Sequence, residues 1–211
     1  MPKSDDKRIL VATTNPGKIR ELRAMLDAPV EWLGLDEFEG IEEVEEDGTS
    51  FEENARKKAL GYAEATGLWT VADDSGLVID ALNGEPGIHS ARYSGEKEKA
   101  EDRSLIDHKN IAKVLSLMRD VPDEQRTGRF VCAMCLGRPG EVLAETRGTV
   151  EGLITRQQRG EGGFGYDPIF YVPDRDKTMA QLNPDEKNSI SHRSNAVKKL
   201  KPVLKKLLRE R

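Results

Sequence analysis

The sequence predicts an α/β domain with a mixed β-sheet. Strand-like and helix-like segments alternate in the first part of the chain, which is the pattern of strands connected by helices. Several strand-like segments follow one another later, which indicates that the sheet mixes parallel and antiparallel strands. The 211 residues are enough for one large domain or two closely joined lobes, and no repeat or flexible linker divides them.

The first strand–helix unit begins near the N-terminus. Residues 8–14 (RILVATT) form an apolar run, residues 15–18 (NPGK) form a turn, and a helix with Ile19, Leu22, Met25 and Leu26 on one face follows. The turn lacks the G-x-x-x-x-G-K-[ST] pattern of a Walker loop. A strand end, a helix N-terminus and Lys18 can nevertheless bind an anion, so both a phosphate site and a plain turn remain open here.

A second helix is predicted after an acidic stretch at residues 36–47. Ser50 and Glu53 match a capping box at its start. Gly67 is expected to end it, and a strand then runs into Asp73. The inward face of this helix is predicted to carry Phe51, Ala55, Ala59, Tyr62 and Ala63.

The remaining elements follow in order. Residues 84–95 are predicted to form a long loop, and a helix is expected near 103–119. Strands are expected near 128–136, 142–150 and 168–172. The C-terminal helix has a basic end that suits the negative pole of the helix dipole, and Pro202 is expected to kink or reset it.

Composition excludes several classes of protein. No apolar run approaches the roughly 18 residues of a membrane span, and the polar N-terminus does not resemble a signal peptide. The net charge of −5 argues against broad nucleic-acid binding. Cys132 and Cys135 have C-x-x-C spacing, but residues three apart on a strand face opposite sides. Two reduced, buried cysteines are therefore expected, as in a cytoplasmic protein.

Two adjacent carboxylates, Asp73 and Asp74, stand where the strand of residues 69–72 is expected to end. The following Ser75-Gly76 is good turn chemistry, so the pair could be a simple turn cap. Adjacent carboxylates repel, however, and burial raises their pKa. A divalent cation relieves both effects, and Mg²⁺ is usually bound by one or two carboxylates and substrate phosphates. Metal-assisted phosphate chemistry is the second interpretation.

Two further motifs are each too short to indicate one function. GEGGFG at residues 160–165 fits G-x-G-x-x-G, but the extended YDPIFYVP follows where a dinucleotide fold needs a helix. Two interpretations of this motif stay open, a plain turn and a loop that places Phe164 and Tyr166 at a binding site. His192 and Arg193, with Lys187 upstream, form a donor-rich cluster that could bind the O6 acceptor of a 6-oxopurine.

Taken together, these segments resemble the inosine triphosphate pyrophosphatase family, which hydrolyses non-canonical purine nucleoside triphosphates. The matching blocks are ATTNPGKIREL, DGTSFEENARKKA, ADDSGLVIDALNGEPGIHSARYSG, GGFGYDPIF and EKNSISHR, in the family's order. The segment GEKEKAEDRSLIDHKN looks longer than the family's usual loop. The resemblance implies a long central mixed sheet flanked by helices, two lobes with a nucleotide cleft between them, and a Mg²⁺-dependent homodimer.

The resemblance also implies roles for individual residues. Asp74 would be the general base and a metal ligand, with Glu46, next to Glu45, and Asp73 as the other metal-binding residues. The substrate-binding residues would be Thr13, Thr14, Asn15, Pro16, Gly17, Lys18, Lys58, Ser75, Phe164, Gly165, Tyr166, Asp167, Lys187, His192 and Arg193.

The expected reaction converts ITP, dITP or XTP to the monophosphate and pyrophosphate. Two alternatives stay open at this point. A phosphatase that forms an aspartyl phosphate usually needs a D-x-D arrangement, which DDSG lacks. A nucleotide sensor would bind the triphosphate with Mg²⁺ and leave it intact.

Overall fold

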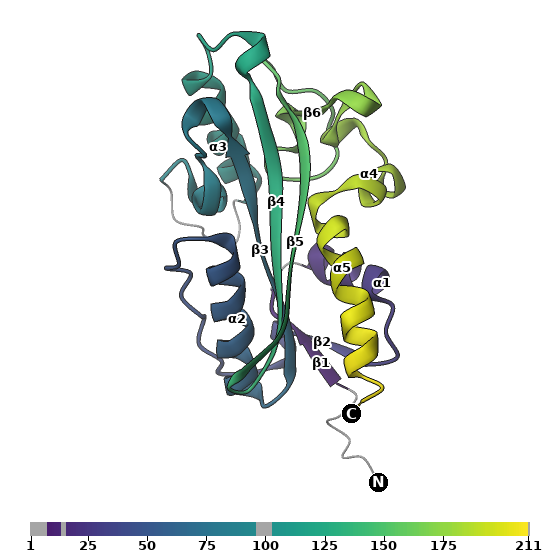
Figure 1. The fold of residues 1–211 in the computed structure, drawn as a ribbon. Helices are drawn as coiled ribbons and strands as arrows, with labels where there is room; N and C mark the ends of the chain where they lie inside the picture. The colour runs from purple at the N-terminus through teal and green to yellow at the C-terminus, as the bar shows by residue number, and fades with distance from the viewer. Residues whose placement is uncertain (1–7, 14–15, 96–102, 211) are drawn as a thin grey trace. The chain divides into compact units, whose positions relative to one another are not determined.

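The computed structural model describes residues 8–13, 16–95 and 103–210. Its strands and helices alternate first and cluster later, as the sequence predicts (Figure 1). The strands are β1 (Arg8–Val11), β2 (Glu31–Gly34), β3 (Trp69–Ile79), β4 (Thr127–Arg138), β5 (Glu141–Ile154), β6 (Phe170–Val172) and β7 (Lys177–Thr178). The helices are α1 (Pro16–Leu26), α2 (Phe51–Thr66), α3 (Arg103–Leu117), α4 (Pro184–Ile190) and α5 (His192–Leu207).

The strands form one mixed sheet in the order β2-β1-β3-β4-β5-β6-β7. Strand β1 is parallel to β2 and to β3, because helical segments connect these strands. Strand β5 is antiparallel to β6, and β6 is antiparallel to β7. The predicted α/β class and mixed sheet are therefore confirmed.

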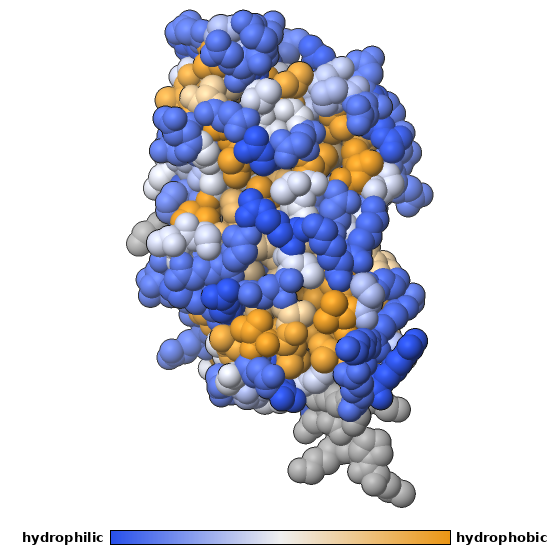
Figure 2. Space-filling view, viewed as in Figure 1, coloured by the Kyte–Doolittle hydropathy of each residue, from blue (hydrophilic) through white to orange (hydrophobic). Residues whose placement is uncertain are grey.

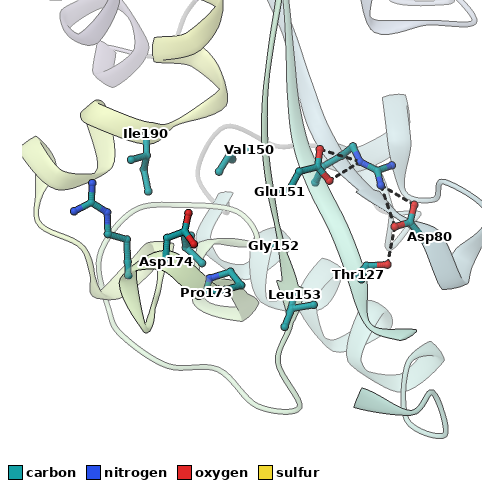
Figure 3. Close-up of a pocket in the computed structure, with 12 residues that line it drawn as sticks. Asp80, Thr127, Val150, Glu151, Gly152, Leu153, Pro173, Asp174 and Ile190 are labelled. Atoms are coloured by element: carbon teal, nitrogen blue, oxygen red, sulfur yellow. Dashed lines mark hydrogen bonds and ion pairs between the residues drawn. The ribbon is translucent and has the colours of Figure 1, made fainter. Parts of the chain in front are cut away.

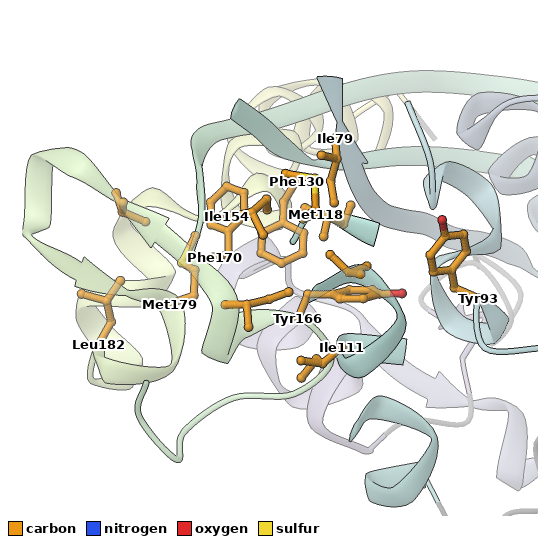
Figure 4. Packing of buried hydrophobic residues seen from close by; sticks show 14 residues of the cluster. Ile79, Tyr93, Ile111, Met118, Phe130, Ile154, Tyr166, Phe170, Met179 and Leu182 are labelled. Carbon is orange, nitrogen blue, oxygen red and sulfur yellow. The ribbon is translucent and has the colours of Figure 1, made fainter. Parts of the chain in front are cut away.

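The chain forms two compact units, each with its own core. Unit 1 contains residues up to 74, 132–148 and 193 onward, and its core joins the first strands to α1 and α5 through residues such as Leu22 and Leu200. Unit 2 contains residues 75–131 and 149–192. Its core joins β3, α3, β4 and β6 through Leu77, Ile111, Phe130 and Phe170, several of which Figure 4 labels.

Helix α2 begins and ends where the sequence predicts. The Ser50 side chain accepts a hydrogen bond from the Glu53 backbone N–H, and Gly67 ends the helix with a φ of 72° in the left-handed region. The capping box itself is only half formed, since the Glu53 carboxylate accepts from the Thr49 N–H at 2.8 Å. The start of α2 is thus fixed on both sides of its N-cap.

Two local features differ from what the sequence predicts, one of them only in part. Strand β3 does not end at the aspartates but continues to Ile79, because Leu77 and Ile79 are buried apolar residues that pair and pack as a strand does. The turn chemistry of Asp-Ser-Gly is overridden by this burial. Helix α5 runs from His192 to Leu207 without a break at Pro202, so the proline does not restart the helix, and a kink there stays a prediction. The buried Leu200 and Leu204 hold both sides of the proline in the core of unit 1.

The surface and the cysteines agree with the composition. Charged and polar side chains cover much of the face in Figure 2, with apolar side chains between them. No helix within the described residues is long and apolar enough to cross a membrane. Cys132 and Cys135 are free and buried, as predicted, and burial raises the pKa of the Cys135 thiol to about 12.

Candidate active site

Asp73 and Asp74 lie in the middle of β3, and their side chains face opposite sides of the sheet, because successive strand residues alternate. Within unit 1, helices α1 and α5 lie on one side of the sheet and α2 lies on the other (Figure 1). Each carboxylate therefore meets different helices. The repulsion that the sequence suggested is reduced, since each aspartate has its own cation.

Asp73 forms ion pairs with two cations from α1 and α5. Its Oδ2 atom lies 3.2 Å from Lys18 Nζ and 3.3 Å from Arg193 Nη2. The Asp73 and Arg193 side chains are only 2% and 4% exposed, so solvent screens this pair weakly. Asp73 thus brings together Lys18 and Arg193, which are 175 residues apart in the sequence.

Asp74 faces α2, where Asn54 and Lys58 are one turn apart on the same helix face. Asn54 Nδ2 donates to Asp74 Oδ2 at 3.1 Å, and Lys58 Nζ lies 3.8 Å from Asp74 Oδ1. Lys58 Nζ also contacts Glu46 Oε2 at 3.1 Å. The predicted residues Glu46, Lys58 and Asp74 therefore form one charged cluster.

Asn54 is a site residue that the sequence analysis missed. Its Oδ1 accepts the Gly48 N–H at 2.8 Å, which leaves the amide NH₂ group to donate to Asp74. A Cβ at Gly48 would lie 2.5 Å from Asn54 Oδ1, so glycine permits this approach. The signal was an asparagine on the apolar face of α2, where Phe51 and Ala55 are buried beside it.

The environment of Asp74 changes its acidity. Burial raises the pKa of the Asp74 carboxyl to about 6, with Glu46 adding repulsion, while Lys58 and the Asn54 hydrogen bond act in the opposite direction. Burial lowers the pKa of Lys58, but attraction to Glu46 and Asp74 outweighs it and the net shift is upward. At neutral pH the cluster thus contains a carboxylate that binds a proton more readily than an exposed aspartate does.

The donor set of this cluster suits a hard divalent cation. Asp74 and Glu46 supply carboxylate oxygens, which Mg²⁺ prefers, and both are within reach of the Lys58 ammonium. Asp73 is on the other side of β3. Among the described residues, no three His, Cys, Asp or Glu side chains are gathered as a metal-binding group. The two carboxylates of Asp74 and Glu46 are the groups of this cluster that could hold such an ion.

The predicted phosphate-binding turn is described in part. Thr13 follows β1 and its N–H donates to the Val11 carbonyl at 2.8 Å. Pro16 and Gly17 begin α1, where a proline is favoured because its missing N–H is not needed. Lys18 is in the first turn of α1 and bonds to Asp73. Thr14 and Asn15 lie outside the described residues.

Unit 2 brings together three of the residues predicted to recognise the base. Asp167 Oδ2 accepts the Phe164 N–H at 2.9 Å and pairs with Lys187 Nζ at 2.5 Å. Lys187 Nζ also lies 4.7 Å from the centroid of the Phe164 ring. Phe164 is 40% exposed, in contrast to the buried phenylalanines Phe130 and Phe170. An aromatic face is thus presented beside an ammonium that has further donors.

The glycine-rich loop lies close to the Asp167 side chain. Gly163 has a φ of 77°, and a Cβ there would lie 2.0 Å from Asp167 Oδ2. The loop is followed by the short 3₁₀ helix η6 (Asp167–Ile169) and not by an α-helix, which agrees with the rejection of a dinucleotide fold. Tyr166 is buried and its hydroxyl donates to the Ser90 carbonyl at 2.8 Å.

The two remaining predicted residues are also in unit 2. Ser75 is the first β3 residue of that unit, directly after Asp74. The His192 ring stacks on Phe130 at a centroid distance of 5.0 Å, and His192 is 8% exposed. This contact gives His192 a packing role in the core of unit 2.

A groove of about 730 Å³ in unit 2 is a separate feature (Figure 3). Arg129 lines it and forms ion pairs with Asp80 and Glu151, both at 2.9 Å. Its lining residues within the described chain are not those that the sequence predicted for the site. The charged clusters around Asp74 and Asp167 are the better candidates, because they combine buried carboxylates, cations and an exposed aromatic ring.

Comparisons with known proteins agree with the sequence motifs. A model of the Ham1 family matches residues 9–203. A protein of Bacillus subtilis named dITP/XTP pyrophosphatase is 49% identical over 199 residues, which cover 94% of this chain and 97% of that protein. A protein of the same name from Geobacter sulfurreducens is 49% identical over 93% of this chain and 96% of its own length.

Solved structures give the same result. The Ham1 protein of Staphylococcus aureus has a TM-score of 0.84 at 43% identity, covering 95% of this chain and 99% of that one. A nucleoside-triphosphatase/dITP/XTP pyrophosphatase from Mycobacterium abscessus has a TM-score of 0.75 at 44% identity, covering 92% and 98%. The family resemblance drawn from the motifs is confirmed, and the chain belongs to the Ham1 family.

Proposed function

We propose that the protein hydrolyses non-canonical purine nucleoside triphosphates, ITP, dITP and XTP, to the monophosphate and pyrophosphate. The observation that carries this proposal is the buried Asp74 carboxylate in contact with Asn54 and Lys58, with Glu46 on the same lysine. Relatives of nearly the same length are named dITP/XTP pyrophosphatase, which supports the substrate class. The reaction would remove such nucleotides from the cellular pool.

We infer that Asp74 and Glu46 hold Mg²⁺. Bound there, the ion would neutralise phosphate charge and stabilise the charge that develops in the transition state. Lys58 would then be released from part of its contact with the carboxylates and could bind a phosphate oxygen. Asp73, which the sequence analysis grouped with the metal, is proposed to hold Lys18 and Arg193 in position.

Asp74 is also the proposed general base. Asn54 donates to Oδ2, so Oδ1 is the atom that orients water and accepts its proton. The water oxygen forms a bond to the α-phosphorus, the bond from that phosphorus to the α–β bridging oxygen breaks, and pyrophosphate leaves with the electron pair. An ionised carboxylate is the form that accepts a proton, and Mg²⁺ bound to the same group would favour that form.

Base recognition is proposed to depend on Phe164, Lys187 and Arg193. The exposed Phe164 ring offers a stacking surface, and stacking does not distinguish one purine edge from another. Lys187 and Arg193 supply donors for O6 of inosine and xanthine. Adenine has an amino group at that position, so two donors would face each other without an acceptor. Asp167 holds Phe164 and Lys187 of this set, through the Phe164 N–H and the Lys187 ammonium.

The family resemblance supports three further proposals. The protein would act as a homodimer, the nucleotide would lie in a cleft between two lobes of a single domain, and the compartment would be the cytoplasm. The acidic net charge of −5 supports a small-molecule substrate in preference to nucleic acid.

Incubation of the protein with Mg²⁺ and ITP, XTP, GTP or ATP, with identification of both products, tests the function. ITP is expected to give IMP and pyrophosphate in one step, and excess EDTA is expected to abolish turnover. Accumulation of IDP and orthophosphate would indicate a phosphatase and contradict attack on the α-phosphorus. Binding of ITP with Mg²⁺ but without turnover would indicate a sensor.

A further inference from the structure

We propose that Asp107 on α3 is a positioning residue that fixes the glycine-rich loop for purine binding. Its carboxylate Oδ2 accepts a hydrogen bond from the Gly165 N–H at 2.8 Å. This inference deepens the proposed function and rests on it, because it assigns Asp107 to the binding of the base and not to the chemical step. Asp107 is not among the residues proposed to hold the metal or to activate water.

The bond adds to a small set of contacts from outside the loop, among them the Gly162 N–H, which donates to the Ala180 carbonyl at 3.1 Å. Residues 160–165 form neither helix nor strand, and Gly160, Gly163 and Gly165 all have positive φ. Ordering one backbone residue costs about 1–2 kcal/mol of conformational entropy, and glycine loses the most freedom. Contacts from outside the loop must therefore offset that loss if Phe164 is to keep one position.

Two carboxylates hold consecutive N–H groups on either side of the Phe164 carbonyl. Asp167 accepts from the Phe164 N–H, and Asp107 accepts from the Gly165 N–H. Asp167 lies only three residues after Phe164, in the short helix η6 that follows the loop, and its carboxylate pairs with Lys187 of α4. Asp107 is 58 residues away in sequence and belongs to a regular helix, so it fixes the loop to the rest of unit 2.

Helix α3 is itself held firmly at this point. Ile111, one turn after Asp107 on the same face, is 2% exposed and belongs to the core that includes Tyr166 (Figure 4). Asn110 accepts the Ser94 N–H at 2.7 Å and donates to the Ser90 carbonyl at 3.3 Å. The Tyr166 hydroxyl donates to that same Ser90 carbonyl. The position of Asp107 is thus set by buried packing on both sides.

The hydrogen-bond acceptor, and not the negative charge, is what this role requires. Asparagine at position 107 keeps an oxygen on Cγ that can accept the Gly165 N–H. Leucine has a similar size but no hydrogen-bond acceptor. The prediction is that Asp107→Asn retains the wild-type KM for ITP and that Asp107→Leu raises it about tenfold, which equals about 1.4 kcal/mol. The kcat value of both variants should stay within about twofold of the wild type, since the reacting atoms are bound elsewhere.

The experiment compares kcat and KM for ITP in the wild type, Asp107→Asn, Asp107→Leu and Asp107→Ala. Glu161→Gln, which removes a carboxylate from an exposed position of the same loop, is the matched charge control. Urea unfolding identifies any variant that is simply destabilised, and Asp107→Ala replaces Asp107→Leu if the larger side chain prevents folding. An equal loss in the Asn and Leu variants, or a loss confined to kcat, would overturn the proposal.

Amide hydrogen exchange without nucleotide tests the positioning role independently of the substrate. The Gly165 amide should exchange about ten times faster in Asp107→Leu than in the wild type, with Asp107→Asn close to wild type. Unchanged exchange in the leucine variant would refute the role of Asp107 even if ITP is the substrate. If the wild type does not hydrolyse ITP and exchange still changes as expected, the proposed function fails and the positioning role stands.

Discussion

The Asp74→Asn substitution should make the metal-free protein more stable at neutral pH while it removes most of the activity. Burial raises the pKa of Asp74 to about 6, against 3.8 for an aspartate in an unfolded chain. One pKa unit equals about 1.4 kcal/mol, so the charged carboxylate costs the folded state up to about 3 kcal/mol. Asparagine keeps the size and an oxygen for Asn54, and it removes the charge.

The sign of the effect depends on pH. Between about pH 3.8 and pH 6 the folded protein binds a proton at Asp74 that the unfolded chain has released. The wild type therefore loses stability as the pH rises through this range, and the full loss is present above pH 6. The gain from Asp74→Asn should reach up to about 3 kcal/mol at pH 7.5 and should largely disappear at pH 4.

Urea unfolding of both proteins in EDTA at pH 4 and pH 7.5 measures this difference. Asp47→Asn is the control with the opposite sign, because hydrogen bonding and attraction to Lys57 lower the pKa of the exposed Asp47. The free energy of unfolding of Asp47→Asn should therefore be lower than that of the wild type at pH 7.5. With Mg²⁺ and ITP, loss of the general base should reduce kcat by roughly 10²–10⁴. A stability gain of the same size at both pH values, or no gain at pH 7.5, would refute the account of Asp74; near-normal turnover would move the base elsewhere.

Three further predictions concern the base and the fold. Arg193→Ala should lower kcat/KM for ITP and XTP more than for ATP, and the difference should correspond to about 1–3 kcal/mol of transition-state free energy. Equal losses for ITP, XTP, GTP and ATP would instead assign Arg193 to the phosphates or to its contact with Asp73. Phe164→Ala should weaken the binding of ITP, XTP, GTP and ATP to the same extent, by roughly 1–3 kcal/mol, because stacking does not read the base edge. A loss for only some of the four would argue against stacking, and Phe164→Tyr is the control that keeps the ring. Arg126→Met should destabilise unit 2 by about 2–5 kcal/mol in urea unfolding, because the buried guanidinium donates to the carbonyls of Ile154, Met118 and Thr155. The control is Arg119→Met at an exposed position, and similar stability of the two variants would show that these carbonyls find other partners.

Much of the fold could be predicted because its signals are local. The start of α2 at Ser50 and its end at Gly67 follow from the chemistry of single residues. The buried runs of β1 and β4 follow from side-chain hydropathy. The predicted end of β3 was wrong because it depended on contacts far away in the sequence. Ser75 and Gly76 favour a turn locally, and the burial of Ile79 in the core of unit 2 decides against it.

The candidate site divides in the same way. The sequence by itself determined which chemical groups are present, the adjacent Asp73 and Asp74, the lysines and the loop with Phe164, since residue types and short spacings are written in the chain. It also contains the alternation that sends neighbouring strand residues to opposite faces, once the segment is known to be a strand.

Only the tertiary structure decided which partner each group meets. Asp73 pairs with Lys18 and Arg193, and Asp74 meets Asn54 and Lys58. Asp107 reaches Gly165 across 58 residues. The physical reason is that hydrogen bonds and ion pairs act over a few ångströms, whereas the separation of these residues along the chain carries no information about their distance in space until the helices pack on the sheet.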